Sequence, residues 1–269
     1  MKQFFLIGLL TIFSGFFACN LQSEPAVADM SQINVNPTPE RISAKDKTPV
    51  LVELFTSEGC SSCPPADRLL AQLEKEQPNP NAEIITLALH VDYWNRLGWK
   101  DEFSSALYSQ RQNVYGQQFK LAQIYTPQMV VDGQKHFVGN NLSEANKAIT
   151  DSAKTEKANI ELTSAENNLK IKISDIPKHA NATVFLAFTE NNLSTSVKGG
   201  ENSGRNLEHT SVVRELKSVG IVTAEQNSLE TETTLQFQPG WKKENLKLVV
   251  FVQDNANRKI LGVNKIGLM

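Results

Sequence analysis

The sequence predicts an α/β domain with a central mixed sheet flanked by helices, followed by an antiparallel β-sandwich-like domain. In the first half, two apolar runs typical of buried strands, residues 49–55 and 83–91, flank a segment whose leucines recur at helical spacing. After about residue 158 the pattern changes to short alternating stretches separated by Asn-rich turns, which are typical of antiparallel strands. The chain of 269 residues is long enough for both domains, and its formal charge of −2, without a basic stripe, excludes nucleic acid as an expected partner.

The first residues have the pattern of an export signal. Lys2 is followed by an apolar stretch that runs to Ala18 and is short for a membrane span. The stretch ends in Phe16-Phe17-Ala18-Cys19, which resembles the bacterial lipobox, with Phe16 where that motif usually has leucine. The resemblance implies that Cys19 is lipidated after cleavage; an ordinary leader cut nearby is the alternative.

The N-terminal region is therefore expected to have two parts. Residues 1–19 are the signal peptide with its lipobox, and residues 20–47, which are polar and have no apolar period, form a flexible tether. A fatty anchor would hold the folded part in the aqueous space beside a membrane. We therefore expect an exported protein on the periplasmic side of the bacterial envelope, as an outer-membrane lipoprotein.

The first folded domain is expected over residues 48–155. Two parallel strands joined through a helix predict a right-handed βαβ unit. A hairpin with an Asp132-Gly133 turn and a helix capped by Ser143 should complete the domain. The expected order is strand 49–55, helix 63–76, strand 83–91, helix 104–119, strand 124–133, strand 135–139 and a helix from residue 143.

Two cysteines, Cys60 and Cys63, lie two residues apart at the turn from the first strand into the first helix. A helix N-terminus carries unpaired N–H groups and partial positive charge, which stabilise a thiolate. The layout therefore predicts a redox centre in which Cys60 attacks and Cys63 resolves the mixed disulfide. A structural disulfide is one alternative, although so small a loop removes little unfolded-state entropy. A metal site is another, but the four histidines are scattered and provide no second ligand pair.

Two polar segments elsewhere are candidates for substrate contacts. Trp94 and Trp99 follow the second strand, at the carboxyl end where open α/β sheets place their sites, and would either shape a substrate groove or cap the core. In the second half, Arg205, His209 and Arg214 belong to a glycine-rich stretch. They would either form an anion pocket facing the cysteines or belong to a long hairpin loop whose polar groups satisfy one another.

The order of elements, the paired cysteines and Thr126-Pro127 at the start of the third strand together resemble the thioredoxin fold over residues 48–152. The resemblance implies that Pro127 is a cis proline against the cysteine pair, preceded by Thr126, with backbone there that pairs with a bound substrate. It also implies that Glu53, the nearest match to a buried carboxylate, assists proton transfer, although one extra residue separates it from Cys60. Gly59 stands where that fold usually has tryptophan.

Longer strings resemble a family of secreted bacterial proteins known only by a thioredoxin-like domain of unknown function. In the first half they are Ser57-Glu58-Gly59-Cys60-Ser61-Ser62-Cys63-Pro64-Pro65-Ala66-Asp67, His90-Val91-Asp92-Tyr93-Trp94, Leu97-Gly98-Trp99-Lys100-Asp101 and Tyr125-Thr126-Pro127-Gln128. In the second half they are Gly200-Glu201-Asn202-Ser203-Gly204-Arg205-Asn206-Leu207-Glu208-His209 and Val212-Val213-Arg214.

The sequence thus leads to the expectation of an exported, lipid-anchored thiol–disulfide oxidoreductase that acts on protein thiols and disulfides of the cell envelope. Pro127 would position the partner, and no organic cofactor is needed. One alternative is a non-catalytic binding module with a structural disulfide, whose second domain, residues 156–269, recognises a protein or envelope component. A second is Cu(I) handling by the thiolate pair, with His90 as the only histidine next to the expected site.

Overall fold

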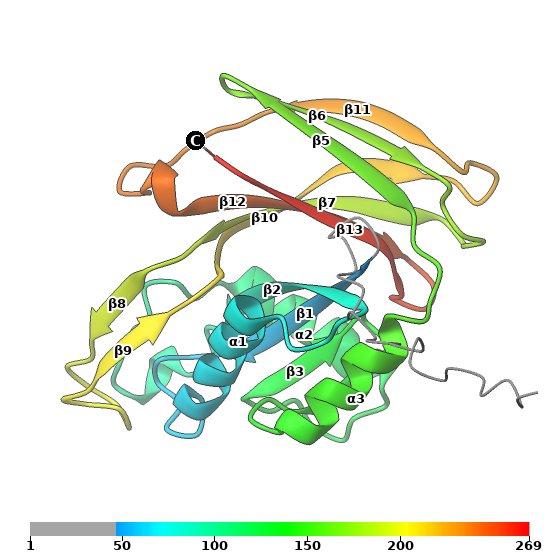
Figure 1. Cartoon of the computed structure of the whole chain (residues 1–269). Coiled ribbons are helices and arrows are strands. Elements are labelled where there is room, and N and C mark those ends of the chain that lie inside the picture. The colour runs from blue at the N-terminus through cyan, green and yellow to red at the C-terminus, as the bar shows by residue number, and fades with distance from the viewer. Residues whose placement is uncertain (1–46, 269) are drawn as a thin grey trace, which may run out of the picture. The chain divides into compact units, whose positions relative to one another are not determined.

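The computed structural model of the chain describes residues 47–268, and its central feature is a mixed sheet of eight strands (Figure 1). The strand order in that sheet is β13-β12-β7-β10-β2-β1-β3-β4. The signal peptide, Cys19 and the tether up to residue 46 lie outside the described residues.

The first half has the expected order of strand, helix, strand, helix, hairpin and helix. Its elements are β1 (Thr48–Thr56), α1 (Pro64–Glu76), β2 (Ala82–His90), the 3₁₀ turn η2 (Asn95–Leu97), α2 (Ala106–Gln118), β3 (Gln128–Val131), β4 (Lys135–Val138) and α3 (Leu142–Ser152). β1 and β2 pair in parallel, and β3 and β4 form the expected antiparallel hairpin. Asp132 and Gly133 in its turn both have positive φ, which suits an Asp-Gly dipeptide.

Two boundaries differ from the expectation. The prediction that Ser143 caps the last helix is wrong: α3 begins one residue earlier, and the Asn141 side chain accepts the N–H of Glu144 at 3.1 Å. β3 begins at Gln128 rather than near residue 124, directly after Pro127, which has no N–H to give to a ladder.

The side chains of β1 alternate between two cores. Val52 and Leu54 belong to the core that β1 shares with helices α1 and α3. Leu51 and Phe55 belong to the other core, which includes Tyr115 of α2. Because successive side chains of a strand point to opposite faces, α1 and α2 lie on opposite faces of this part of the sheet.

The second half contributes four strands to the large sheet and two smaller antiparallel sheets, β11-β6-β5 and β8-β9. A hydrophobic core that includes Ile171, Leu186 and Val250 contains residues of both the three-stranded sheet and the large sheet. The elements are β5 (Asn159–Ala165), β6 (Asn168–Ser174), β7 (Ala182–Glu190), β8 (Leu193–Ser196), β9 (Asn206–His209), β10 (Val212–Val222), β11 (Leu229–Thr234), the 3₁₀ turn η3 (Lys243–Asn245), β12 (Leu246–Asp254) and β13 (Ile260–Gly267).

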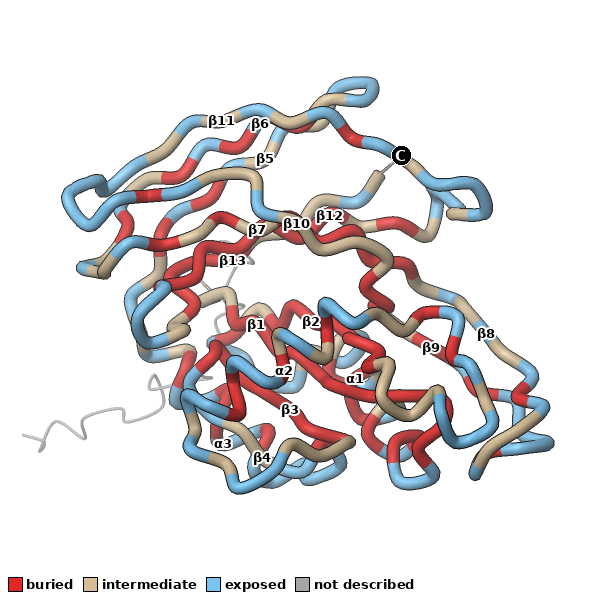
Figure 2. The backbone as a smooth tube through the Cα atoms, turned by 180° about the vertical axis from the view of Figure 1, so that it is seen from behind, coloured by how far each residue is buried: buried red, intermediate tan, exposed pale blue. Residues whose placement is uncertain are grey.

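The large sheet is continuous across residue 156. β10 pairs in parallel with β2 through Val212 and Ala88, so the second half extends the sheet of the first. The core around Phe55 and Tyr115 also contains Ala187 and Phe251 from the second half. Figure 2 shows buried backbone both in β1 and β2 and in β7 and β13. The consequence for function is that the loops of the second half are held next to the ends of β1 and β2. Within residues 47–268 no helix combines the length and the apolar character that a membrane span requires.

Candidate active site

The cysteine pair closes a disulfide in the turn between β1 and α1. The Cα atoms of Cys60 and Cys63 are 5.4 Å apart. The Cys60 N–H donates to the carbonyl of Ser57 and the Cys63 N–H to that of Cys60, each over 3.2 Å. Cys63 is the N-cap of α1, and the prolines that follow occupy the first helical turn, where a backbone donor is not needed. Both sulfurs therefore lie at the positive end of a helix.

Pro127 lies across Gly139 from the first turn of that helix. The Thr126–Pro127 peptide bond is cis. A Cβ added at Gly139 would lie 3.1 Å from the Cβ of Ala66 and 3.2 Å from that of Pro127, so Gly139 fills the small space between the helix and the proline. The Trp94 indole Nε1 donates to Thr126 Oγ1 at 2.8 Å. A Cβ added at Gly59 would lie 3.2 Å from the Trp94 Cβ, so Trp94 spans from the cysteine turn to the proline.

Glu58, just before the cysteines, is a buried carboxylate with a partner on each oxygen. Its Oε2 accepts the indole N–H of Trp99 at 2.7 Å, and its Oε1 is 3.0 Å from His209 Nε2 at the end of β9. The Glu58 N–H donates to Asp101 Oδ2 at 2.9 Å. The second half of the chain is thereby joined to the cysteine turn through a buried carboxylate–imidazole pair.

A second buried pair lies next to it. His90 ends β2, and its Nδ1 is 2.7 Å from Asp101 Oδ2. The rings of His90 and His209 meet edge to face, with centroids 5.2 Å apart. Burial disfavours charge on His90, but the carboxylates of Asp101, Asp67 and Glu58 outweigh it, so the pKa of His90 is raised. Burial disfavours charge on Asp101, but the charge of His90 and the hydrogen bonds from His90 and two backbone N–H groups outweigh it, so the pKa of Asp101 is lowered.

Asp67 completes this group from helix α1. It follows Cys63 by four positions, and residues four apart lie on the same face of a helix. Burial raises the pKa of the Asp67 carboxyl in spite of the opposing effect of the nearby His90. His90 pairs in register with Thr56 on β1, and neither Thr56 Oγ1 nor His90 Nε2 has a hydrogen-bond partner among residues 47–268.

Glu53 occupies the other face of the sheet. It accepts hydrogen bonds from Arg111 Nε at 2.6 Å and from the Tyr115 hydroxyl at 2.5 Å, both on α2. The second half of the chain also contacts this group, because Arg111 Nη1 donates to Gln253 Oε1 at 3.0 Å. Since α1 lies on the opposite face, the structure separates Glu53 from the group formed by Asp67 and His90.

The three residues expected to form an anion pocket, Arg205, His209 and Arg214, bind different acceptors instead. His209 contacts Glu58, and Arg214 forms an ion pair with Glu190 at 3.0 Å. Arg205 Nη1 donates to Asn202 Oδ1 at 3.1 Å. The interpretation as a hairpin loop fits the structure here, since β8 and β9 form a two-stranded sheet around this loop.

Asn202 is the residue of that loop that touches the cysteine turn itself. It is fully buried, and its Nδ2 donates both to the carbonyl of Glu58 at 2.8 Å and to the carbonyl of Cys60 at 2.9 Å. The neighbouring Glu201 accepts the N–H of Ser61 at 2.9 Å. Sequence reasoning assigned no role to Asn202, Asp67 or Asp101, although all three lie within the strings that carry the family resemblance.

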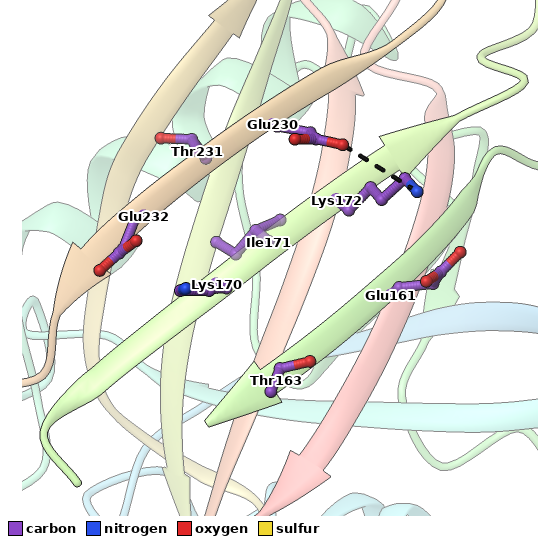
Figure 3. A pocket seen from close by; sticks show the side chains of 8 residues that line it. All are labelled: Glu161, Thr163, Lys170, Ile171, Lys172, Glu230, Thr231 and Glu232. Atoms are coloured by element: carbon purple, nitrogen blue, oxygen red, sulfur yellow. Dashed lines mark ion pairs between the residues drawn. The ribbon is translucent and has the colours of Figure 1, made fainter. Parts of the chain in front are cut away.

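The described part of the chain offers no ready metal centre. No group of three or more His, Cys, Asp or Glu residues within 47–268 has an arrangement that could hold a metal ion. A hollow of about 580 Å³ lies on the outer face of the β11-β6-β5 sheet (Figure 3). Three glutamates and two lysines line it, among them Lys172 and Glu230 at 4.0 Å, so most of its charge is balanced.

Comparison with known proteins decides the family. The family described as "Protein of unknown function (DUF1223)" matches residues 51–253, which include the cysteine turn and the loop that carries Asn202. The chain belongs to the DUF1223 family. No curated protein matches the chain.

One solved structure is similar over most of this chain. Protein AGR_C_4864 from Agrobacterium tumefaciens is 25% identical, with a TM-score of 0.66, and the match covers 83% of this chain and 96% of that one. A domain of the outer membrane lipoprotein Omp28 from Porphyromonas gingivalis is 14% identical over 42% of this chain and 88% of its own, with a TM-score of 0.24. Hypothetical protein PH1083 from Pyrococcus horikoshii OT3 is 18% identical over the same shares of the two chains, with a TM-score of 0.20.

Proposed function

We propose that the protein is a thiol–disulfide oxidoreductase on a thioredoxin-like scaffold, which exchanges disulfides with protein thiols through Cys60 and Cys63. The observation that carries the proposal is the disulfide at the N-terminus of α1 with Pro127 beside the same helical turn. The helix N-terminus favours the thiolate form that attacks disulfides. A purely stabilising role is a weaker reason for this bridge, because it closes a loop with a sequence separation of only 3.

The exchange needs two sulfur displacements. The Cys60 thiolate attacks one sulfur of a partner disulfide, and the other partner sulfur leaves as a thiolate. The Cys63 thiol then gives up its proton and attacks the Cys60 sulfur, which closes the Cys60–Cys63 bond and releases the second partner thiolate. Two electrons pass to the partner, whose thiolates take up protons. The reverse sequence oxidises a partner dithiol.

The proton of Cys63 requires an acceptor on the α1 face of the sheet, and we assign it to Asp67. The pKa of Asp67, raised above its ordinary value by burial, favours uptake of a proton by this carboxylate. His90, held by Asp101, supplies the positive charge beside Asp67. Glu53, the acceptor that the thioredoxin resemblance implied, lies on the other face and is engaged by Arg111.

The residues expected to contact a bound partner differ in what they contact in the structure. Pro127 lies across Gly139 from Ala66 in the first turn of α1, and the Trp94 indole joins Thr126 to the segment beside Gly59. Trp99 contacts Glu58 rather than open solvent through its indole N–H, so it serves to hold the turn. Of the five expected substrate contacts, Arg205 and His209 also act through other residues, Asn202 and Glu58.

A structural disulfide within a binding protein is the second candidate function. It is favoured by one observation: the exposed fraction of both Cys60 and Cys63 is 0%. A sulfur that a partner cannot reach does not exchange, so the exchange function requires that the cover over the cysteine turn can open.

We further propose that the protein is exported and attached to a membrane through Cys19. The apolar leader and the lipobox-like Phe16-Phe17-Ala18-Cys19 support this placement. Fatty-acid labelling in a bacterial host should label the wild-type chain and spare the Cys19→Ser variant. Equal labelling of both, or of neither, would argue against the anchor.

Trapping of the mixed disulfide tests the exchange function. The reduced Cys63→Ser variant, mixed with a disulfide-bonded protein, should accumulate a covalent adduct because Cys60 attacks and nothing resolves. The reduced Cys60→Ser variant is the matched control and should form far less adduct. Absence of adduct from both variants, with both folded, would favour the structural disulfide.

A further inference from the structure

The loop between β8 and β9, residues 197–205, covers the cysteine turn, and we call it the strap. Two of its residues bind main-chain groups of the turn: Asn202 binds the carbonyls of Glu58 and Cys60, and Glu201 binds the Ser61 N–H. The strap reaches this place from the second half of the chain, because β9 leads into β10, which pairs with β2.

Hydrogen bonds within the strap fix its conformation. The Val197 N–H donates to the carbonyl of Arg205 at 2.9 Å and the Gly204 N–H to that of Val197 at 2.8 Å. Arg205 occupies the Oδ1 of Asn202, which leaves the Asn202 NH₂ group free to donate to both carbonyls. The amide is thus oriented by the strap itself toward Cys60.

The strap also packs closely on the loop that follows β2. A Cβ added at Gly199 would lie 2.4 Å from the carbonyl oxygen of Gly98, and one added at Gly200 would lie 3.2 Å from the Cβ of Trp99. Trp99 in turn donates to Glu58, and His209 just beyond the strap binds the same carboxylate. The cover therefore has three fixed points, at Asn202, at Gly199 and at His209.

The groups under the strap are of one chemical kind. They are two main-chain carbonyls and one main-chain N–H, which accept and donate hydrogen bonds as the backbone of an extended polypeptide does. A partner that covers these groups in place of the strap must replace their hydrogen bonds, since a buried polar group without one is costly. A polypeptide backbone supplies both donors and acceptors there, whereas a small dithiol such as dithiothreitol supplies neither in that pattern.

We propose that the strap is a gate specific for polypeptide: it occupies the main-chain groups of the cysteine turn, and a polypeptide partner displaces it to reach Cys60. This proposal rests on the exchange function, and it explains how sulfurs with no exposed surface can react. Asn202 is its central residue, acting on specificity and not on the sulfur chemistry. The strap would keep small thiols out and admit a partner that takes over its hydrogen bonds.

The test compares rates of reduction of the native disulfide in purified protein, by alkylation of freed thiols and mass spectrometry. Asn202→Asp keeps the size of the side chain but removes both donors and places negative charge against two carbonyl oxygens. Asn206→Asp is the matched control, since Asn206 is exposed on β9 and has no side-chain hydrogen bond within residues 47–268. Two reductants are used: dithiothreitol, and an unfolded peptide that carries two cysteines.

In the Asn202→Asp variant, reduction by dithiothreitol should accelerate roughly tenfold or more, and the Ser61 amide should lose protection from hydrogen exchange. Reduction by the peptide should accelerate less, so the preference of the wild type for peptide over dithiothreitol shrinks. The Asn206→Asp control should behave as wild type.

Two results would overturn the gate: an unchanged dithiothreitol rate in folded Asn202→Asp protein, or an equal acceleration with both reductants, which would remove its specificity for polypeptide. If the wild-type protein still exchanges with the peptide, either of these results would overturn the gate alone and leave the exchange function intact. Faster reduction of the variant by dithiothreitol, with no reaction of either protein with the peptide, would overturn both the polypeptide partner and the exchange function.

Discussion

Asn202 donates a hydrogen bond to the main-chain carbonyl of Cys60 over 2.9 Å, across a separation of 142 positions in the sequence. The first half of the chain alone would therefore leave the cysteine turn uncovered on this side. Because Asn202 is fully buried and oriented by Arg205, the contact is a built part of the site. The two halves form one functional unit around the disulfide.

Gly199→Ala tests the same contact surface without touching a hydrogen bond to the turn. An alanine Cβ at this position would lie 2.4 Å from the carbonyl oxygen of Gly98, a contact with rigid backbone that forces the strap outward. We expect faster reduction of the disulfide by dithiothreitol. Gly267→Ala, at a position with no atom within 4 Å of the added Cβ, is the control. Equal rates in all three proteins would contradict the role of the strap.

Asp67→Asn should slow the step in which Cys63 resolves the mixed disulfide. The variant keeps the shape of the side chain but cannot take up a proton, and general acid–base groups typically contribute about 10²-fold or more. The slowing should be largest near neutral pH and should shrink at high pH, where Cys63 ionises unaided. Rapid-quench trapping of the mixed disulfide measures it, and a pH-independent effect would point to a structural role instead.

Glu53→Gln should reduce stability without changing exchange in the folded protein. The substitution leaves Arg111 as a buried charge without its carboxylate, which costs about 3–5 kcal/mol for buried pairs of this kind. Urea unfolding measures the loss. A resolving step that slows in Glu53→Gln as much as in Asp67→Asn would return the proton-transfer role to Glu53.

The buried pair of His90 and Asp101 should give stability a defined pH dependence. Because the pKa of His90 is raised in the folded protein, its contribution to the free energy of unfolding is fully present below the ordinary pKa of 6.5. That contribution is lost as pH rises through the raised pKa. Because the pKa of Asp101 is lowered, its contribution to the free energy of unfolding is present above the ordinary pKa of 3.8. That contribution is lost as pH falls through the lowered pKa. The stability difference between wild type and His90→Asn should therefore be greatest between pH 3.8 and 6.5.

His136 provides the matched control for that titration. It is a partly exposed histidine whose pKa is lowered by burial, so its protonation weakens the fold as pH falls. His136→Asn should remove a dependence of the opposite sign. Urea unfolding of the three proteins from pH 4 to pH 9 checks both signs, and a His90→Asn difference that grows with pH would contradict the charged pair.

Local signals in the sequence were sufficient for the first half of the fold. The apolar runs of β1 and β2, the Pro64-Pro65 start of α1 and the Asp132-Gly133 turn act over a few residues, and each element formed where expected. The cap of the last helix lies two residues before the expected one, because Asn141 and Ser143 are both good caps and only the geometry selects Asn141.

The site could be predicted only in part, for a physical reason. Cys60, Cys63 and Pro127 carry short motifs, whereas the face of Glu53 depends on strand register, which one residue of slip would reverse. The sheets of the two halves join through one parallel register pair, Val212 with Ala88, and no local pattern marks it. The contact of Asn202 with Cys60 follows from that join, so it too was beyond a reading of the sequence alone.

The reduction potential of the Cys60–Cys63 pair tests the exchange function most directly. It is measured on the purified protein by thiol trapping across glutathione buffers, with Asn202→Asp alongside so that slow access does not pass for thermodynamic stability. We predict a reduction potential among those of exchange catalysts, about −120 to −270 mV, and a reactive Cys60. A value below about −300 mV, with cysteines that stay unreactive in both proteins, would contradict it and identify a structural disulfide.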